Sequence, residues 1–314
     1  MAITYQKAQQ LSDDLSKHLA GNETEWRAFL RSAGNLYKYS FSDQLMIYAQ
    51  RPDATATASY ETWNTIGRYV RRGSKGIALF TDNGSGLKYV FDVSDTGEGR
   101  SRNRQALPPW RMKKRHTQAV FDRLESDYGT DGASLSYPDR LRGIVSAAVE
   151  DSFPELYARM EQEISGSFLE DLDETNRRTL LHQAVSNSVS YMVFTRMGVD
   201  PELYLDGDDF SGLWNFNTPE LLSVLGEAVN DIAAPILREV EREVKRIDRG
   251  NLQKPLEKTN GRIFNEFNDL KRERSENHEQ QPDIHDEGRF PISQSDDGGA
   301  GGGHREVRVM NSLS

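Results

Sequence analysis

The sequence predicts an α+β fold: a small N-terminal domain of helices plus a β-hairpin or small antiparallel sheet, then a mainly helical domain, then a disordered tail. Three observations lead to this prediction. Apolar residues recur at helical spacing near the N-terminus and again beyond residue 116. Two apolar runs flank the turn sequence DNGSG at 82–86. Hydrophobic content falls sharply after about residue 250.

Helices are expected first. Residues 5–20 and 23–33 carry apolar side chains three and four residues apart, and each segment precedes a glycine. Ser42 is the expected N-cap of a third helix, which should end before Pro52. A short helix is expected at 59–66.

The hairpin comes next, with strands expected at 76–81 and 87–93 around the turn. The polar stretch 94–115 is expected to form a loop. Its part from Arg100 to Arg115 holds seven Lys or Arg and no acidic residue. Such a segment suits either a phosphate-contacting arm or a solvated linker.

Long helices dominate the rest of the predicted structure. The expected segments are 117–126, 138–150, 154–164, 173–197 and 218–248. The charges at 238–246 pair at i,i+3 and i,i+4 spacing, which favours an exposed helix over a binding patch. We therefore predict three divisions of the chain, at 1–117 (binding domain), 118–250 (helical domain) and 251–314 (disordered acidic and Gly-rich linker or tail).

Composition narrows the functional classes. The chain has 314 residues and no cysteine, which excludes disulfides and thiolate metal sites. No apolar run is long enough for a transmembrane helix, and the N-terminus lacks the apolar centre of a signal peptide, so we expect a cytoplasmic protein without membrane contact. The net charge of −10 conceals a division. Residues 1–120 carry 18 Lys and Arg against 11 Asp and Glu, whereas the remainder carries 21 against 38.

Aromatic rings alternate with cations between residues 35 and 80. Unstacked bases can lie on such rings while Arg and Lys hold the phosphates. An ordinary amphipathic helix and strand with a solvated basic turn is the alternative, and Trp63 suits a core position as well as a stacking platform. The candidate DNA-binding residues are Tyr37, Lys38, Tyr39, Arg51, Trp63, Arg68, Tyr69, Arg71, Arg72, Lys75 and Lys88.

Catalytic patterns fail on inspection. The residues around Gly73-Ser74-Lys75 have the wrong order for a phosphate-binding P-loop. A partial H-E-x-x-H pattern at 278–282 has proline in place of the second ligand, and His182 has no ligand set beside it. Residues 206–209 (DGDD) hint at a calcium loop, but Phe210 stands where an EF-hand needs an oxygen ligand, so a polar loop is the better interpretation. We therefore assign no catalytic residue, no metal ligand and no cofactor, and predict that the protein is not an enzyme.

The N-terminal third resembles the N-terminal domain of ArdC-type antirestriction proteins, as found at the start of large proteins of conjugative elements in Firmicutes. The residues that carry the resemblance are YKYSF at 37–41, QL at 44–45, IYAQRP at 47–52 and W-x-x-x-G-R-x-V-x-x-G-x-K-G at 63–76. The resemblance covers roughly residues 5–125. It implies a domain that binds single-stranded DNA and shields a transferred strand from host restriction.

ArdC-type proteins normally carry a second, zinc-dependent peptidase-like domain. Residues 181–201 resemble the helix that follows the H-E-x-x-H helix in such folds. The third ligand, a glutamate, would fall around 185–188, where the chain has none. The resemblance thus implies a degenerate, metal-free zincin-like domain. The Gly-rich end of the chain is expected to mark a truncated or split version of a longer protein.

The expected function is sequence-tolerant binding of single-stranded DNA, linked to antirestriction or to conjugative transfer of a mobile element. Proteins of the transfer or restriction machinery are further expected partners. Two alternatives stay open. The chain could instead be a protein-interaction module of a conjugation or replication complex, or a metallopeptidase-like relic without activity that still binds zinc.

Overall fold

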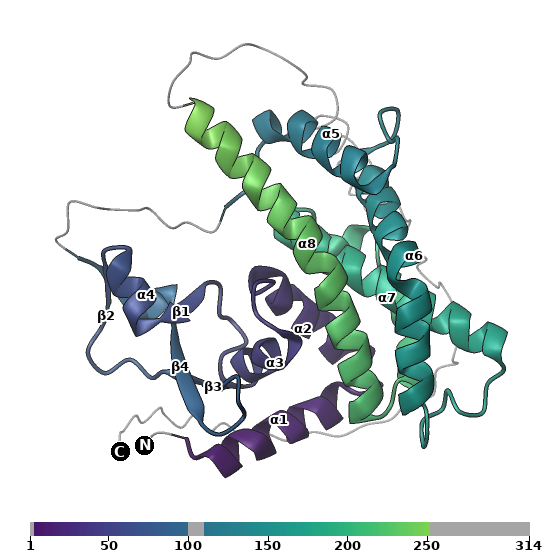
Figure 1. The fold of residues 1–314 in the computed structure, drawn as a ribbon, viewed down its shortest axis with the longest axis horizontal. Helices are drawn as coiled ribbons and strands as arrows, with labels where there is room; N and C mark the ends of the chain where they lie inside the picture. Colours follow the sequence, from purple (N-terminus) through teal and green to yellow (C-terminus); the bar gives the residue numbers. More distant parts are fainter. Residues whose placement is uncertain (1–2, 100–109, 252–314) are drawn as a thin grey trace, which may run out of the picture. The chain divides into compact units, whose positions relative to one another are not determined.

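The structure, a computed structural model, describes residues 3–99 and 110–251, which all belong to one compact unit, Met1–Leu270. The predicted tail lies outside the described residues, apart from Asn251. The elements follow one another along the chain (Figure 1) as α1 (Tyr5–Leu19), α2 (Glu23–Asn35), α3 (Phe41–Gln50), β1 (Thr57–Ser59), α4 (Tyr60–Thr65), β2 (Arg68–Val70), β3 (Ile77–Phe80), β4 (Leu87–Asp92), η1 (Val93–Asp95), β5 (Thr96–Glu98), η2 (Lys114–His116), α5 (Thr117–Tyr128), α6 (Tyr137–Glu163), α7 (Glu174–Met197), η3 (Pro201–Leu203), η4 (Asp208–Asn215) and α8 (Pro219–Asn251).

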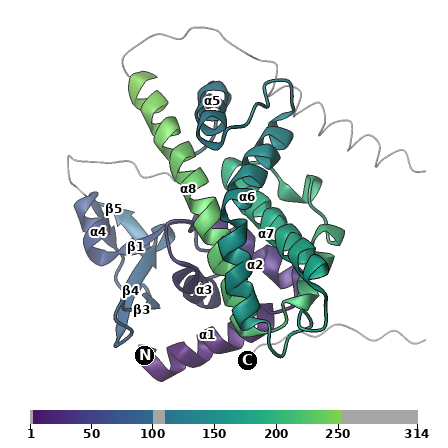
Figure 2. The ribbon, with the colours of Figure 1, turned by 45° about the vertical axis from the view of Figure 1, so that its right-hand side comes forward.

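The predicted α+β class is confirmed. Strands β1, β4 and β3 form an antiparallel sheet in that order, with Ile77 opposite Val90 in the predicted hairpin. Strands β2 and β5 form a separate antiparallel ribbon, in which Tyr69 lies opposite Gly97. Helix α3 contacts both β3 and α8, so it lies between the sheet and the helices (Figures 1 and 2).

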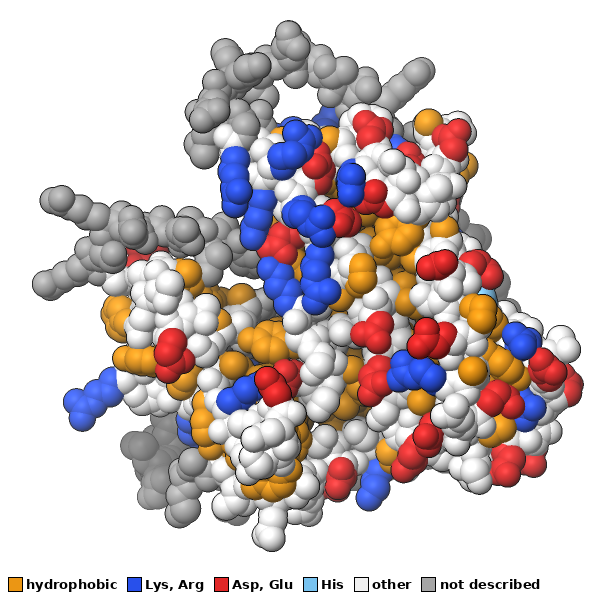
Figure 3. Space-filling model, viewed as in Figure 1, with side chains coloured by type: hydrophobic (Ala, Val, Ile, Leu, Met, Phe, Trp, Pro, Cys, Tyr) orange, Lys and Arg blue, Asp and Glu red, His pale blue; other side chains and the backbone are white. Residues whose placement is uncertain are grey.

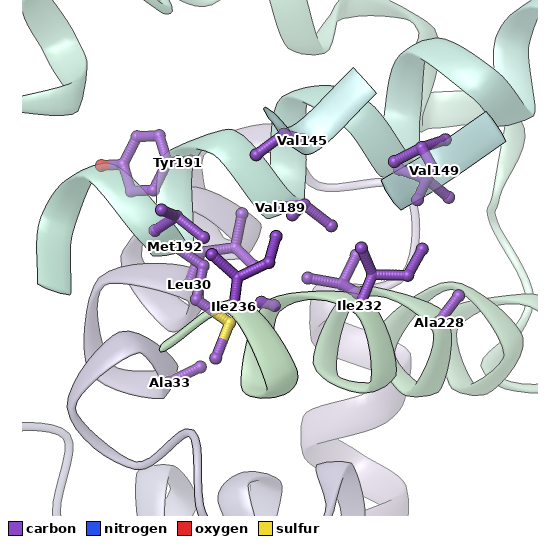
Figure 4. Close-up of a cluster of buried hydrophobic side chains, with 14 of the residues drawn as sticks. Leu30, Ala33, Val145, Val149, Val189, Tyr191, Met192, Ala228, Ile232 and Ile236 are labelled. Atoms are coloured by element: carbon purple, nitrogen blue, oxygen red, sulfur yellow. The ribbon is translucent and has the colours of Figure 1, made fainter. Parts of the chain in front are cut away.

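Most of the protein's hydrophobic core lies among the helices. Side chains of α2, α6, α7 and α8 meet there, because each of these helices presents an apolar face to the others (Figure 4). The labelled members include Leu30, Ala33, Val145, Val149, Val189, Met192, Ile232 and Ile236. A smaller cluster joins the sheet to the N-terminal helices and contains Ala8, Leu36, Met46, Ile47, Ala54, Ile77, Leu79 and Val90.

The larger cluster includes residues from both sides of the predicted division at residue 117. Trp26 of α2 is fully buried, and its indole Nε1 donates a hydrogen bond to Ser188 Oγ of α7 at 2.9 Å. The N-terminal helices thus use α7 and α8 as part of their core. The division into two domains stays a prediction. Among the described residues, every helix is too short or too polar to cross a lipid bilayer.

Three local predictions are corrected. Ser40, not Ser42, caps α3, and its side chain accepts a hydrogen bond from the Asp43 N–H at 3.2 Å. Helix α6 continues through Pro154 instead of ending before it. The expected loop from residue 94 begins with η1 and β5, and its residues 100–109 lie outside the described part of the chain.

Candidate nucleic-acid interface

Residues 71–76 connect β2 to β3 through a turn that is fixed at its base. Gly73 has φ of +90°, a conformation that glycine adopts without strain. The backbone N–H of Arg71 donates to the Asp95 carbonyl at 2.9 Å, and the Ser74 hydroxyl lies 3.3 Å from the same oxygen. Segment η1 therefore holds the turn in place.

Asp92 in turn fixes η1. Its carboxylate accepts hydrogen bonds from the Ser94 hydroxyl at 2.7 Å and from the backbone N–H groups of Ser94, Ala56 and Thr55. Burial alone would raise the pKa of this carboxyl, but these hydrogen bonds outweigh burial and lower the pKa below its usual value. An ionised Asp92 thus anchors the segment behind the turn.

Four of the predicted cations lie around this turn. Arg71 is exposed and donates through Nη1 to the Ser94 carbonyl at 2.9 Å. Arg51 is half-buried, forms an ion pair with Asp95 and donates to Ser94 Oγ at 2.8 Å. The side chains of Arg72 and Lys75 are exposed and have no hydrogen-bond or ion-pair partner among residues 3–99 and 110–251.

A groove of about 650 Å³ lies beside the turn and is lined by Ile3, Gln50, Arg51, Lys75, Gly76, Ile77 and Tyr89. Gln50 closes one wall, because its side-chain amide both donates to and accepts from the backbone of Ala78 in β3, at 2.8 and 2.9 Å. Lys75 and Arg51 supply positive charge. Tyr89 supplies a ring that is 36% exposed.

Tyr69 presents a second free ring, 49% exposed. It points out of β2 and lies against Gly97 of β5, where the methyl group of an alanine would come within 2.6 Å of the Tyr69 ring atom Cζ. The glycine therefore leaves room for the ring. We call the set Arg51, Tyr69, Arg71, Arg72, Lys75 and Tyr89 the turn patch.

Tyr37 and Trp63 correct the prediction of stacking platforms. Each ring is only 2% exposed, so neither has a face on which a base could stack. Tyr37 donates its hydroxyl to Glu241 and accepts from Trp110 Nε1 at 2.9 Å. Trp63 Nε1 donates to the Phe91 carbonyl at 2.9 Å. Both rings belong to the core.

The other predicted residues have partners within the protein. Burial raises the pKa of Tyr39, whose hydroxyl donates to the Thr57 carbonyl at 2.8 Å. Arg68 donates through Nε to Thr96 Oγ1 at 2.7 Å. Lys38 pairs with Glu241 at 2.7 Å, and Lys88 pairs with Asp82 at 2.8 Å. These four residues lie outside the turn patch.

Four predicted residues instead line a cleft of about 240 Å³ between the N-terminal segment and the helices, namely Tyr37, Lys38, Tyr39 and Trp63. Arg196 of α7 lies at the same cleft, with its guanidinium carbon 3.7 Å from the Trp110 ring centre. Burial lowers the pKa of Arg196. The predicted residues thus fall into three groups. Five belong to the turn patch, four line the cleft, and the remaining two are Arg68, bonded to Thr96, and Lys88, paired with Asp82.

Sequence reasoning missed Tyr89, Asp92, Ser94 and Asp95 as parts of the site. The pattern Asp-x-Ser-Asp at 92–95 is typical of side chains that bond to nearby backbone, and could have indicated an anchor. His182 contacts Glu150 at 2.8 Å. Within residues 3–99 and 110–251, three or more His, Asp or Glu side chains nowhere gather in a way that could hold a metal ion.

Comparison with known proteins gives no match: no family model, no curated protein and no solved structure is similar to this chain. Functional inference therefore depends on the residues of the turn patch and their geometry.

Proposed function

We propose that this protein binds single-stranded DNA, with little sequence preference, through the turn patch. One observation carries the proposal: Arg72 and Lys75 lie exposed and unpaired among the described residues, on a turn that Arg71 and Arg51 also flank. Cations without internal partners can neutralise phosphates without first breaking an ion pair.

Two exposed rings favour a single strand over a duplex. Tyr69 and Tyr89 each offer a face to solvent, and bases can stack on such faces only when they are not already stacked in a helix. Stacking is tolerant of sequence, because every base has an aromatic face. Each stack contributes about 1–3 kcal/mol.

The biological setting that we propose follows the resemblance of residues 37–76 to ArdC-type antirestriction domains. In that setting the protein would bind a transferred strand in the cytoplasm of a cell that receives a mobile element, and would protect the strand from restriction. The helical segment would support this binding without catalysis, as a degenerate zincin-like domain.

Fluorescence anisotropy tests the binding proposal. We expect a labelled single-stranded oligonucleotide to bind more tightly than the matching duplex. The four cations of the turn patch should contribute about −2.8 to the slope of log K against log salt. Arg72→Gln with Lys75→Gln should flatten the slope by about 1.4. The matched control removes two exposed cations of α1, Lys7→Gln with Lys17→Gln, and should leave the slope unchanged. Equal slopes for both double variants would refute the assignment of the turn patch.

A further inference from the structure

The C-terminal half of α8 carries a row of cations on one face. Arg238, Arg242, Lys245 and Arg249 follow one another at intervals of four, three and four residues, and Arg246 lies beside them. All five are exposed. Figure 3 shows blue side chains gathered over this half of α8. We call these five residues the α8 stripe, which extends over about 16 Å of helix.

The acidic residues of the same segment point inward. The side chains of Glu239, Glu241 and Glu243 are 18, 11 and 12% exposed. Their cationic partners Arg242, Lys245 and Arg246 are 69, 48 and 70% exposed. The predicted pairing at i,i+3 and i,i+4 spacing is thus present at 2.5 to 2.6 Å, and in each ion pair the cation is the more exposed partner.

The inward acids have interior partners. Glu241 accepts from the buried Tyr37 hydroxyl. Asp248, whose side chain is 41% exposed, is not an inward acid, but it too accepts from an interior group, the fully buried His116 ring, at 2.8 Å. Arg115 also reaches Asp248, at 2.5 Å, and brings the exposed cations Lys113 and Lys114 beside the helix. The acids serve packing, whereas the cations face solvent.

Helix stability does not account for the whole stripe. The helix macrodipole favours cations only in the last turn. Ion pairs with glutamates three or four residues earlier account in part for Arg242, Lys245 and Arg246. Arg238 has no ion-pair partner in the described part of the chain, and like Arg242 it precedes the helix end at Asn251 by more than two turns. Their exposure on the same line as Arg249 instead matches a surface that meets an extended anion.

We propose that the α8 stripe is a second phosphate-binding surface, which contacts the sugar–phosphate backbone of single-stranded DNA. This inference rests on the proposed function for the identity of the polyanion. Four of the five cations are arginines, whose planar guanidinium groups suit phosphate oxygens. A nucleic-acid strand also carries a negative charge on every nucleotide, so successive phosphates can each meet one cation of the row.

An acidic protein surface fits less well. Protein interfaces are enriched in aromatic side chains at their centre. Large hydrophobic side chains are exposed at six places in the described part of the chain, and none of them is on α8: Tyr60, Tyr69, Tyr89, Leu135, Phe168 and Trp214. The stripe offers charge without an apolar anchor, which favours contact with a backbone rather than with a folded partner.

The test uses the full chain with Arg238→Gln, Arg242→Gln and Arg249→Gln together. The matched control is Lys7→Gln, Lys17→Gln and Arg178→Gln, in which Arg178 has a helical acidic partner as Arg242 has. Binding of labelled oligothymidine is measured by anisotropy over a salt series, and thermal unfolding confirms that each variant folds. We expect the stripe variant to lower the salt slope by about 2, so that affinity at 0.1 M salt falls about 100-fold, and the control to match wild type.

The outcomes separate the two proposals. A stripe variant that binds like wild type, while Arg72→Gln with Lys75→Gln binds weakly, overturns the α8 stripe and leaves the turn patch standing. The opposite result supports the stripe and overturns the turn patch. Competition by polyglutamate as effective as that by oligothymidine, at equal charge, would show that the stripe takes an acidic polypeptide and would overturn the assignment to DNA. Wild-type protein that binds no oligothymidine overturns both.

Discussion

Glu241 receives three hydrogen bonds at one carboxylate, from the Tyr37 hydroxyl, from Lys38 and from Lys245. Burial alone would raise its pKa, but the bonds from Lys245, Lys38 and Tyr37 outweigh burial and lower the pKa to about 2. The folded protein therefore holds this group ionised over almost the whole pH range. Glu241 joins the segment after α2 to the inner face of α8.

Glu241→Gln should destabilise the protein by about 3 kcal/mol at pH 7, because the charged acceptor of two ammonium groups is lost. A carboxyl group whose pKa is lower in the folded than in the unfolded protein stabilises the fold at pH values above its unfolded pKa, which is 4.5 for Glu241. This contribution disappears as the pH falls from 4.5 towards 2. Urea unfolding at pH 7 and at pH 3 checks this. Variant and wild type should differ less at pH 3, and an equal difference at both pH values would contradict the account.

Tyr69→Ala and Trp63→Ala should have opposite profiles. Tyr69 is half exposed, so its loss should weaken DNA binding by about 1–3 kcal/mol and leave stability nearly unchanged. Trp63 is buried, so its loss should cost about 3–5 kcal/mol of unfolding free energy. Anisotropy and urea unfolding on both variants check the pair. A Trp63 variant as stable as wild type would return that ring to the candidate platforms.

The sequence could not distinguish these two rings. Trp63 lies in a helix of six residues and Tyr69 in a strand of three, and neither element is long enough for its periodicity to show which side faces inward. The cations of the turn patch were predictable, because consecutive Arg71 and Arg72 beside Gly73 indicate an exposed turn. Their anchoring by η1 depends on contacts more than 20 residues apart in the chain.

At the scale of elements, helices with long apolar periodicity were predictable, including α8 with its internal Pro235, but the continuity of α6 through Pro154 was not. Pro154 and Glu150 both lie at exposed positions of α6. Because proline has no backbone N–H, the Glu150 carbonyl lacks its helical hydrogen-bond donor. That carbonyl can meet water, which lowers the cost of the proline. Strands β1, β2 and β5 have three residues each and leave too little pattern to predict.

The β2–β5 ribbon gives a prediction at this scale. Gly97→Ala would bring a methyl group against the Tyr69 ring and should displace that ring from its place on the ribbon. DNA binding should weaken as much as in Tyr69→Ala. In the double variant the two losses should not add, because both remove the same ring position. Anisotropy on the two single variants and the double variant completes this double-mutant cycle. Losses of binding free energy that add fully would contradict the view that both substitutions act by removing the Tyr69 ring from its position.

At the scale of the whole described unit, the N-terminal helices and the later helices share one core. Gly226 of α8 shows how close the contact is, because a methyl group there would lie 2.1 Å from the Phe41 ring of α3. Such a contact between distant segments leaves no local signal in the sequence. The hydrophobic faces of α3 and α8 were predictable, but their mutual packing was not.

Gly226→Ala should lower the unfolding free energy by about 1–3 kcal/mol through overpacking against Phe41, although alanine is the better helix former. Gly143→Ala in α6 is the matched control, since a methyl group there meets nothing within 4 Å. The control should gain up to about 1 kcal/mol. Urea unfolding followed by tryptophan fluorescence measures both, and similar shifts in the two variants would contradict the close packing of α3 on α8.

Gln50 has a consequence for how copies of this protein behave in concentrated solution. Strand β3 ends the sheet on one side, where bare backbone groups would invite a strand from a neighbouring molecule. The carboxamide of Gln50 takes up both the N–H and the carbonyl of Ala78, as a visiting strand would. At Ala78, one side chain thereby takes the place that a strand of a second copy would need.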